Sequence, residues 1–284
     1  MRHATSRRIG PIGFRIGSDW RAPVALLDAL YADYPVPTVA DATVRLTATR
    51  PWRRRVRPAI ALGGDLMLPD AAPLPLEHGL LAAEMAMNLQ VALGHRRHLL
   101  LHAAAAERDG RCVILTGESG AGKSTLSALL MAAGWRFLGD EFVLIDLASG
   151  MARPFPRLVS LKNESVAELA RRMPGARFGP VLQGTPKGTI RHLVPDARAV
   201  AAMDVPATPA LLLFPRFGAA RAVRRVDEGE AFVRLTQAST NYALLGEAGF
   251  DALTRLVTRV PARAIDYADS DEGVTLVEDL WCAL

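Results

Sequence analysis

The chain has 284 residues, of which 50% are hydrophobic, and its formal net charge is +5. This length and composition allow a sizeable buried core, in one large domain or in two modest ones. No apolar run approaches the roughly 20 residues needed to cross a bilayer, and the N-terminal residues lack the apolar stretch of a secretion signal. We therefore expect a globular protein of the cytoplasm without a membrane partner.

Neither the charge nor the cysteines define a site. The 34 Lys and Arg residues, most of them Arg, include one run at Arg53–Arg55. No groove-reading motif accompanies that run, so nucleic acid is not an expected partner. The only two cysteines, Cys112 and Cys282, argue against a disulfide framework and against a zinc site.

The first 75 residues predict a small accessory region that is partly β. Short extended segments at 13–16 and 44–47 are separated by prolines. Residues 69–75 begin and end with proline and predict a linker. We therefore place the domain boundary between residues 75 and 76, with the accessory region at 1–75 and the main domain at 76–284.

From about residue 96 onward, predicted strands alternate with predicted helices, which indicates an α/β fold. Asp109-Gly110 between two β-like runs predicts a hairpin. The predicted strands are 98–105, 111–115, 135–138, 142–145, 210–214 and 264–267. The predicted helices are 77–93, a segment within 158–172, 231–237, 248–258 and 274–281. The stretch 174–188 predicts a loop.

The most informative motif follows the apolar run 112–115 and precedes a helix. Its residues are Gly117, Glu118, Ser119, Gly120, Ala121, Gly122, Lys123 and Ser124, the Walker A pattern of a phosphate-binding loop (P-loop). Glycines let backbone N–H groups face an anion, and the helix adds its positive N-terminal end. The motif predicts bound ATP with Lys123 on its β and γ phosphates, Ser124 on Mg²⁺, and Thr125 completing the nucleotide-binding residues.

Two acidic residues, Asp140 and Glu141, stand at the end of the strand predicted after the loop helix. In a parallel sheet that strand end would lie beside the loop. Phosphoryl transfer needs a carboxylate for the metal and a group that orients or deprotonates the attacking oxygen. The pair therefore predicts a phosphoryl-transfer site.

From His98 to about Ile145 the chain resembles the HPr kinase/phosphorylase superfamily, in particular its HPr kinase-related branch. A strand-end His (His102), a hairpin, the loop, one helix and the acidic pair follow in that family's order and spacing. The resemblance implies a P-loop kinase core of the HPr kinase type with a smaller N-terminal accessory region. It implies catalytic roles for Asp140 as base, for Lys123 and for His102, and a metal held by Ser124, Glu141 and Asp140.

The same resemblance implies a Ser or Thr hydroxyl of a protein or peptide as acceptor, and HPr kinases assemble as hexamers, so this chain could form a homo-oligomer. The chain departs from those kinases at Thr125, where they carry Glu. It also lacks their later glycine-rich signature. The resemblance therefore does not extend to HPr itself as acceptor or to the reverse phosphorylase activity.

Two alternatives remain open at this level. One is a small-metabolite kinase of the shikimate or gluconate type, although the long upstream segment and the Asp-Glu pair are not typical of it. The other is a nucleotide-binding switch, which would need Lys123 but not Asp140. Three cations, Lys162, Lys187 and Arg191, are candidates for contacts with the transferred phosphate or the acceptor.

Overall fold

The computed structural model describes residues 2–67 and 71–284, so the first two residues of the predicted linker lie outside the described residues. The chain forms two compact units. The first contains Met1–His95 and Arg177–Val194, and the second contains Arg96–Ala176 and Pro195–Leu284. This division differs from the predicted boundary at 75/76, because the helix after the linker and a later hairpin both pack with the N-terminal region.

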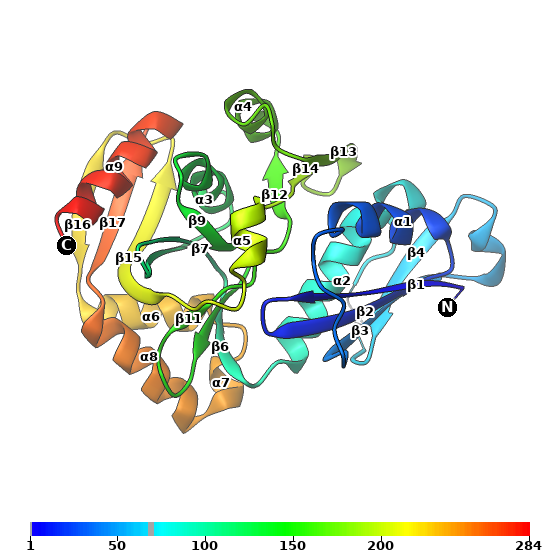
Figure 1. Cartoon of the computed structure of the whole chain (residues 1–284), viewed down its shortest axis with the longest axis horizontal. Helices are drawn as coiled ribbons and strands as arrows, with labels where there is room; N and C mark the ends of the chain where they lie inside the picture. The colour runs from blue at the N-terminus through cyan, green and yellow to red at the C-terminus, as the bar shows by residue number, and fades with distance from the viewer. Residues whose placement is uncertain (1, 68–70) are drawn as a thin grey trace. The chain divides into compact units, whose positions relative to one another are not determined.

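The first unit is built on a sheet with the strand order β1-β2-β3-β4-β5 (Figure 1). Its strands are β1 (His3–Ile9), β2 (Ile12–Ser18), β3 (Ala42–Ala48), β4 (Ala59–Gly64) and β5 (Leu74–Pro75). β2 and β3 are parallel because α1 (Arg21–Leu30) connects them, whereas the other pairs are antiparallel. Two short 3-10 turns, η1 (Pro51–Arg54) and η2 (Leu76–His78), lie in the connections.

Helix α2 (Gly79–Gly94) explains why residues 76–95 belong to the first unit. It packs against α1 and against β3 and β4. The Glu84 side chain of α2 accepts a hydrogen bond of 2.9 Å from the Tyr31 hydroxyl, and both groups are buried. A helix that buries its apolar side chains on a sheet is part of that sheet's core.

The stretch predicted as a loop at 174–188 is largely a strand, so that prediction was wrong. β13 (Phe178–Thr185) and β14 (Gly188–Leu193) form an antiparallel hairpin of the first unit. Arg177 pairs with Asp33 at 2.7 Å, and the His78 ring nitrogen Nε2 lies 2.8 Å from the Gln183 carbonyl. The Gly and Pro residues of this stretch are typical of loops and led to the wrong prediction. The segment is a strand because it pairs with the next segment of the chain, β14.

The second unit has a mixed six-stranded sheet with the order β16-β17-β15-β8-β7-β9. Its strands are β7 (Ala103–Arg108), β8 (Arg111–Thr116), β9 (Arg136–Gly139), β15 (Thr208–Phe217), β16 (Ala222–Val226) and β17 (Ala262–Tyr267). β8, β15 and β17 are parallel, and β7 is antiparallel to both β8 and β9. The chain therefore has the predicted α/β fold, but the sheet is mixed rather than parallel.

Helices cover both faces of this sheet (Figure 1). α3 (Lys123–Ala132) and α9 (Ser270–Cys282) contribute to one buried cluster, and α6 (Glu228–Ala238) and α8 (Glu247–Arg259) contribute to the other. A smaller sheet, β11-β10-β6, joins the second cluster. The remaining elements are β6 (His98–Leu101), β10 (Val143–Asp146), β11 (Ala152–Arg153), β12 (Val159–Lys162), α4 (Glu164–Arg172), α5 (Ala197–Ala201) and α7 (Tyr242–Leu245).

None of the helices formed by residues 2–67 and 71–284 combines the length and apolar character that crossing a membrane requires.

Candidate functional site

The loop between β8 and α3 occupies the carboxyl edge of the six-stranded sheet. β8 delivers the chain to Gly117, and α3 begins at Lys123. Gly120 and Gly122 have φ angles of 89° and 90°, a region in which L side chains are strained. The glycine-rich loop, residues 117–122, therefore has the strand–loop–helix context that the sequence predicted.

A glycine is required at position 122 for a second reason. A Cβ on Gly122 would lie 2.6 Å from the Tyr267 hydroxyl oxygen and 3.3 Å from the Phe217 Cβ, whereas one on Gly120 would meet nothing within 4 Å. Tyr267 is buried at the end of β17 and its ring packs edge-on against Phe217. The ends of β15 and β17 thus support the last turn of the loop.

Lys123 is buried and folds back over the loop. Its ammonium group donates hydrogen bonds of 2.7 Å to the Gly117 carbonyl and 2.9 Å to the Glu118 carbonyl. Burial lowers the pKa of Lys123, while Asp140 and Glu141 act in the opposite direction. The positive charge of Lys162, at the end of β12, also lowers the pKa of Lys123.

The two predicted acids lie beside the loop. The Ser124 hydroxyl donates a hydrogen bond of 3.0 Å to Asp140 Oδ1, and Asp140 follows the end of β9 and is only 3% exposed. β7 separates β9 from β8, but β8 and β9 run in the same direction, so their ends share one edge of the sheet. Asp140 therefore lies next to the loop, although the sheet is mixed and not parallel as the prediction assumed.

Asp140 is electrostatically unusual. Burial and the neighbouring charge of Glu141 raise its pKa to about 7. Hydrogen bonds from Ser124 and the Glu141 backbone, and the charge of Lys123, act in the opposite direction and lower the pKa. Its other oxygen, Oδ2, is buried and has no hydrogen-bond partner among the described residues. A buried carboxylate oxygen without a partner is costly, and such groups are typical of functional sites.

Glu141 and His102 form the exposed side of the same site. The His102 Nε2 atom lies 3.5 Å from Glu141 Oε2, and both side chains are partly exposed. Glu141 has a φ of 72°, a backbone region that costs free energy for a residue other than glycine. The structure thus brings His102, Ser124, Asp140 and Glu141 together at one edge of the second unit.

The remaining predicted cations divide between the units. Lys162 lies in the second unit, but Lys187 and Arg191 belong to the β13–β14 hairpin of the first. The Arg191 guanidinium donates to the Gly179 carbonyl at 3.0 Å and lies 4.6 Å from the centre of the Phe178 ring. Arg191 thus has a structural role within its own hairpin.

A cavity of about 1200 Å³ borders the glycine-rich loop. It extends from His102 along the loop to the ends of β15 and β17, with β16 and α6 on its far side. Among the residues that line it are Arg216, Phe217, Arg224 and Asp266, none of which belongs to a motif that predicts a site. Three of them, Arg216, Phe217 and Asp266, stand at or near carboxyl ends of predicted strands, a position at which ligands bind in α/β sheets.

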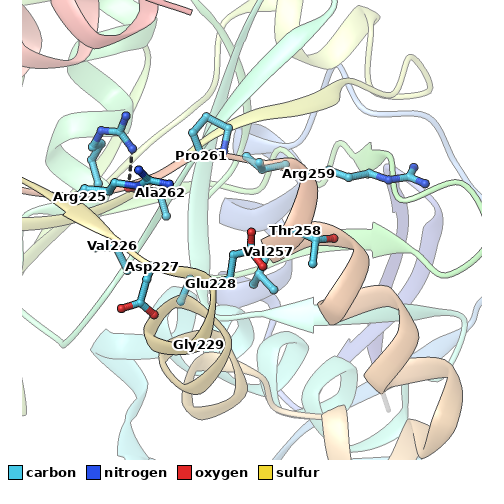
Figure 2. A pocket seen from close by; sticks show the side chains of 13 residues that line it. Arg225, Val226, Asp227, Glu228, Gly229, Val257, Thr258, Arg259, Pro261 and Ala262 are labelled. Carbon is cyan, nitrogen blue, oxygen red and sulfur yellow. Dashed lines mark hydrogen bonds between the residues drawn. The ribbon is translucent and has the colours of Figure 1, made fainter.

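A second cavity, of about 710 Å³, lies at the opposite edge of the sheet, where β17 begins. Figure 2 shows Asp227 and Glu228 at its side and Arg259 extending away from both. Asp227 is engaged in capping α6, because its Oδ1 atom accepts a hydrogen bond from the Glu230 backbone. This cavity has none of the loop or strand-end groups found around the first.

Comparisons with known proteins concern both sequence and structure. A family model described as "SynChlorMet cassette protein ScmC" matches residues 80–204, which include the loop and the acidic pair. A solved structure, the Hpr(Ser) kinase/phosphatase from Coxiella burnetii, is similar with 14% sequence identity and a TM-score of 0.30. The similarity covers 65% of this chain and 99% of that one. No curated protein sequence matches this chain.

Proposed function

We propose that this chain is an ATP-dependent kinase that transfers the γ-phosphoryl group to a Ser or Thr hydroxyl of a protein or peptide. The observation that carries the proposal is the buried Asp140 beside the loop, with Oδ1 accepting a hydrogen bond from Ser124 and Oδ2 without a hydrogen-bond partner in the described part of the chain. Such a carboxylate can take part in holding Mg²⁺ beside the loop serine, and its second oxygen is placed to accept a proton from an acceptor hydroxyl, which a protein that only bound nucleotide would not require.

The loop and α3 are suited to hold a triphosphate. The backbone N–H groups of the loop and the N-terminal end of α3 attract anions, and the Lys123 ammonium can exchange its two carbonyl partners for phosphate oxygens. His102 and Lys162 add polar or cationic groups near the same place. Thr125 continues the first turn of α3.

The oxygen donors at this edge fit Mg²⁺. Ser124, Glu141 and Asp140 supply a hydroxyl and two carboxylates, and Mg²⁺ is usually held by one or two carboxylates together with waters and phosphate oxygens. The described residues contain no cluster of three or more His, Cys, Asp or Glu that could hold a metal alone. Bound Mg²⁺ supplies neutralisation of the phosphate charge during transfer.

In the proposed reaction, Asp140 Oδ2 accepts the proton of the acceptor hydroxyl. The acceptor oxygen forms a bond to the γ-phosphorus while the bond from that phosphorus to the β–γ bridging oxygen breaks, and ADP leaves with that bonding pair. Because Oδ2 is buried, the acceptor has to displace the side chains that cover it. Burial then excludes water, which limits wasteful hydrolysis of ATP.

The test is incubation of the purified chain with γ-labelled ATP and Mg²⁺, alone and with lysate of its source organism, beside the Asp140→Asn variant. A labelled macromolecule that is lost with the variant supports the proposal. Label confined to small molecules would instead indicate a small-metabolite kinase. Nucleotide binding without any transfer would indicate a switch.

A further inference from the structure

We infer that the 1200 Å³ cavity beside the loop holds the nucleoside end of the nucleotide, with Phe217 against the base and Asp266 on the ribose. This inference rests on the proposed kinase function and adds the residues that distinguish a nucleotide from a bare chain of phosphates. The acceptor then has to approach from the side of Asp140.

The strand order gives the direction of the bound nucleotide. Along the edge where the loop lies, β9 and Asp140 are on one side of β8, and β15 and β17 are on the other. The phosphate to be transferred has to face Asp140. A nucleotide whose phosphates follow the glycine-rich loop therefore directs its nucleoside away from Asp140, toward the ends of β15 and β17.

The cavity extends from His102, past the loop, to that side. The loop residues 117–121 form one wall, and Pro215–Phe217 of β15 and Asp266 of β17 form another. Its volume exceeds the roughly 300–1,000 Å³ of typical small-molecule pockets, so a whole nucleotide has room there. His102, which lies beside Glu141, marks the end of the cavity nearest to Asp140, and the strand-end residues mark the other end.

The side chains suit a base and a sugar. Phe217 is 52% exposed, and the edge-on contact with Tyr267, at 5.8 Å between ring centres, fixes its orientation. An exposed and oriented aromatic face is a platform on which a base can stack. Asp266 forms a bidentate pair with Arg216, and its carboxylate can also accept a hydrogen bond from a ribose hydroxyl.

The far wall of the cavity carries a net positive charge. Arg224 makes two hydrogen bonds to Glu230, at 2.7 and 2.6 Å, and Arg234 pairs with the same carboxylate at 2.6 Å. Asp227 and Asp266 also act on Arg224, but over the whole lining the guanidinium groups of Arg216, Arg224 and Arg234 outnumber the carboxylates of Glu118 and Asp266 by one. That charge favours an anionic ligand in the cavity, as a nucleotide is.

The experiment compares ATP with inorganic tripolyphosphate by calorimetric titration in the presence of Mg²⁺, using the full chain. Tripolyphosphate can occupy the loop but has no nucleoside. The variants are Phe217→Ala and Asp266→Asn. The matched control is Arg221→Ala, because Arg221 is half-exposed, pairs with Asp279 at 3.1 Å and does not line the cavity.

We expect each cavity variant to weaken ATP binding about tenfold and to leave tripolyphosphate binding within about twofold, because loss of a stacking or hydrogen-bonding partner affects only the nucleoside. Arg221→Ala should bind both ligands like the wild type. Equal weakening of both ligands, or unchanged ATP binding, would overturn the nucleoside assignment. Failure of the wild type to bind either ligand would instead overturn the proposed function.

Discussion

The Ser124 hydroxyl donates its hydrogen bond to Asp140 across 3.0 Å, which joins the first turn of the helix after the loop to the end of β9. These residues are sixteen positions apart in the sequence. The hydroxyl that we propose as a magnesium ligand and the proposed base are therefore held together by one direct contact. The contact also orients Asp140, because it occupies Oδ1 and leaves Oδ2 for another partner.

Asp140→Asn should slow phosphoryl transfer severely while keeping ATP affinity within a few-fold. Asparagine has nearly the same shape and can still accept the Ser124 hydrogen bond, but it cannot take up a proton. We expect the transfer rate to fall by about 10²–10⁴-fold, the usual contribution of a general base. Labelled-ATP transfer and calorimetric titration measure the two quantities. Asp109→Asn, at the exposed β7–β8 turn, serves as control, and normal transfer by Asp140→Asn would refute the base assignment.

The same substitution should change how stability depends on pH in magnesium-free buffer. Since the pKa of Asp140 is raised from 3.8 to about 7, the folded state binds its proton more tightly than the unfolded state does. Its burial therefore costs nothing below pH 4 and destabilises the wild type increasingly between pH 4 and 7. Relative to Asp140→Asn, the wild type should lose about 2 kcal/mol between pH 5 and pH 8. Urea unfolding at both pH values measures this, and a constant difference would contradict it.

Lys123→Ala should remove measurable ATP binding, because the ammonium group is the buried cation of the loop. Lys162→Ala is the matched comparison. The charge of Lys162 lowers the pKa of Lys123, but Lys162 lies at the end of β12 and not in the loop. We therefore expect at most a few-fold loss of ATP affinity. Calorimetric titration with Mg-ATP tests both, and circular dichroism confirms folding. ATP affinity within tenfold of wild type in Lys123→Ala would be inconsistent with a phosphate-binding role.

Gly122→Ala should destabilise the protein more than Gly120→Ala. Both positions have positive φ, so both alanines carry a backbone cost of about 1 kcal/mol. Only the alanine at 122 also meets the Tyr267 hydroxyl, at 2.6 Å, and this should add about 1–3 kcal/mol. Denaturant unfolding measures the difference.

The variant Tyr267→Phe tests whether the Tyr267 hydroxyl causes the extra destabilisation by Gly122→Ala. Tyr267→Phe removes the clashing oxygen, and the next ring atom lies 3.7 Å from the added Cβ. The double variant Gly122→Ala/Tyr267→Phe should therefore recover part of the lost stability. Without recovery, the clash with Tyr267 is not the source of the extra cost.

The sequence predicted the local features well because short-range chemistry specifies them. Asp109-Gly110 has positive φ at both residues and turns between β7 and β8. The strand–loop–helix order around Lys123 also follows from local pattern, whereas the adjacency of Asp140 depends on the pairing of β8, β7 and β9. The resemblance assigned roles to these residues, but their distances required the structure.

Long-range pairing was less predictable. The run 98–105 reads as one strand, but β6 pairs with β10 in one sheet and β7 pairs with β8 and β9 in another, with His102 at the break. β1 escaped prediction because its residues, His-Ala-Thr-Ser-Arg-Arg-Ile, are mostly polar. The cavity residues at the ends of β15 and β17 carry no motif, and only the parallel pairing of distant strands brings them to the loop.

Glu141 adopts a backbone conformation that glycine would adopt with less strain, at φ 72°. Glu141→Gly should thus relieve roughly 1 kcal/mol of strain, yet it would remove the carboxylate that faces His102. Selection for thermal stability and selection for activity would favour different residues at this position. A library screened only for survival of heating should therefore enrich glycine at position 141 and yield inactive proteins.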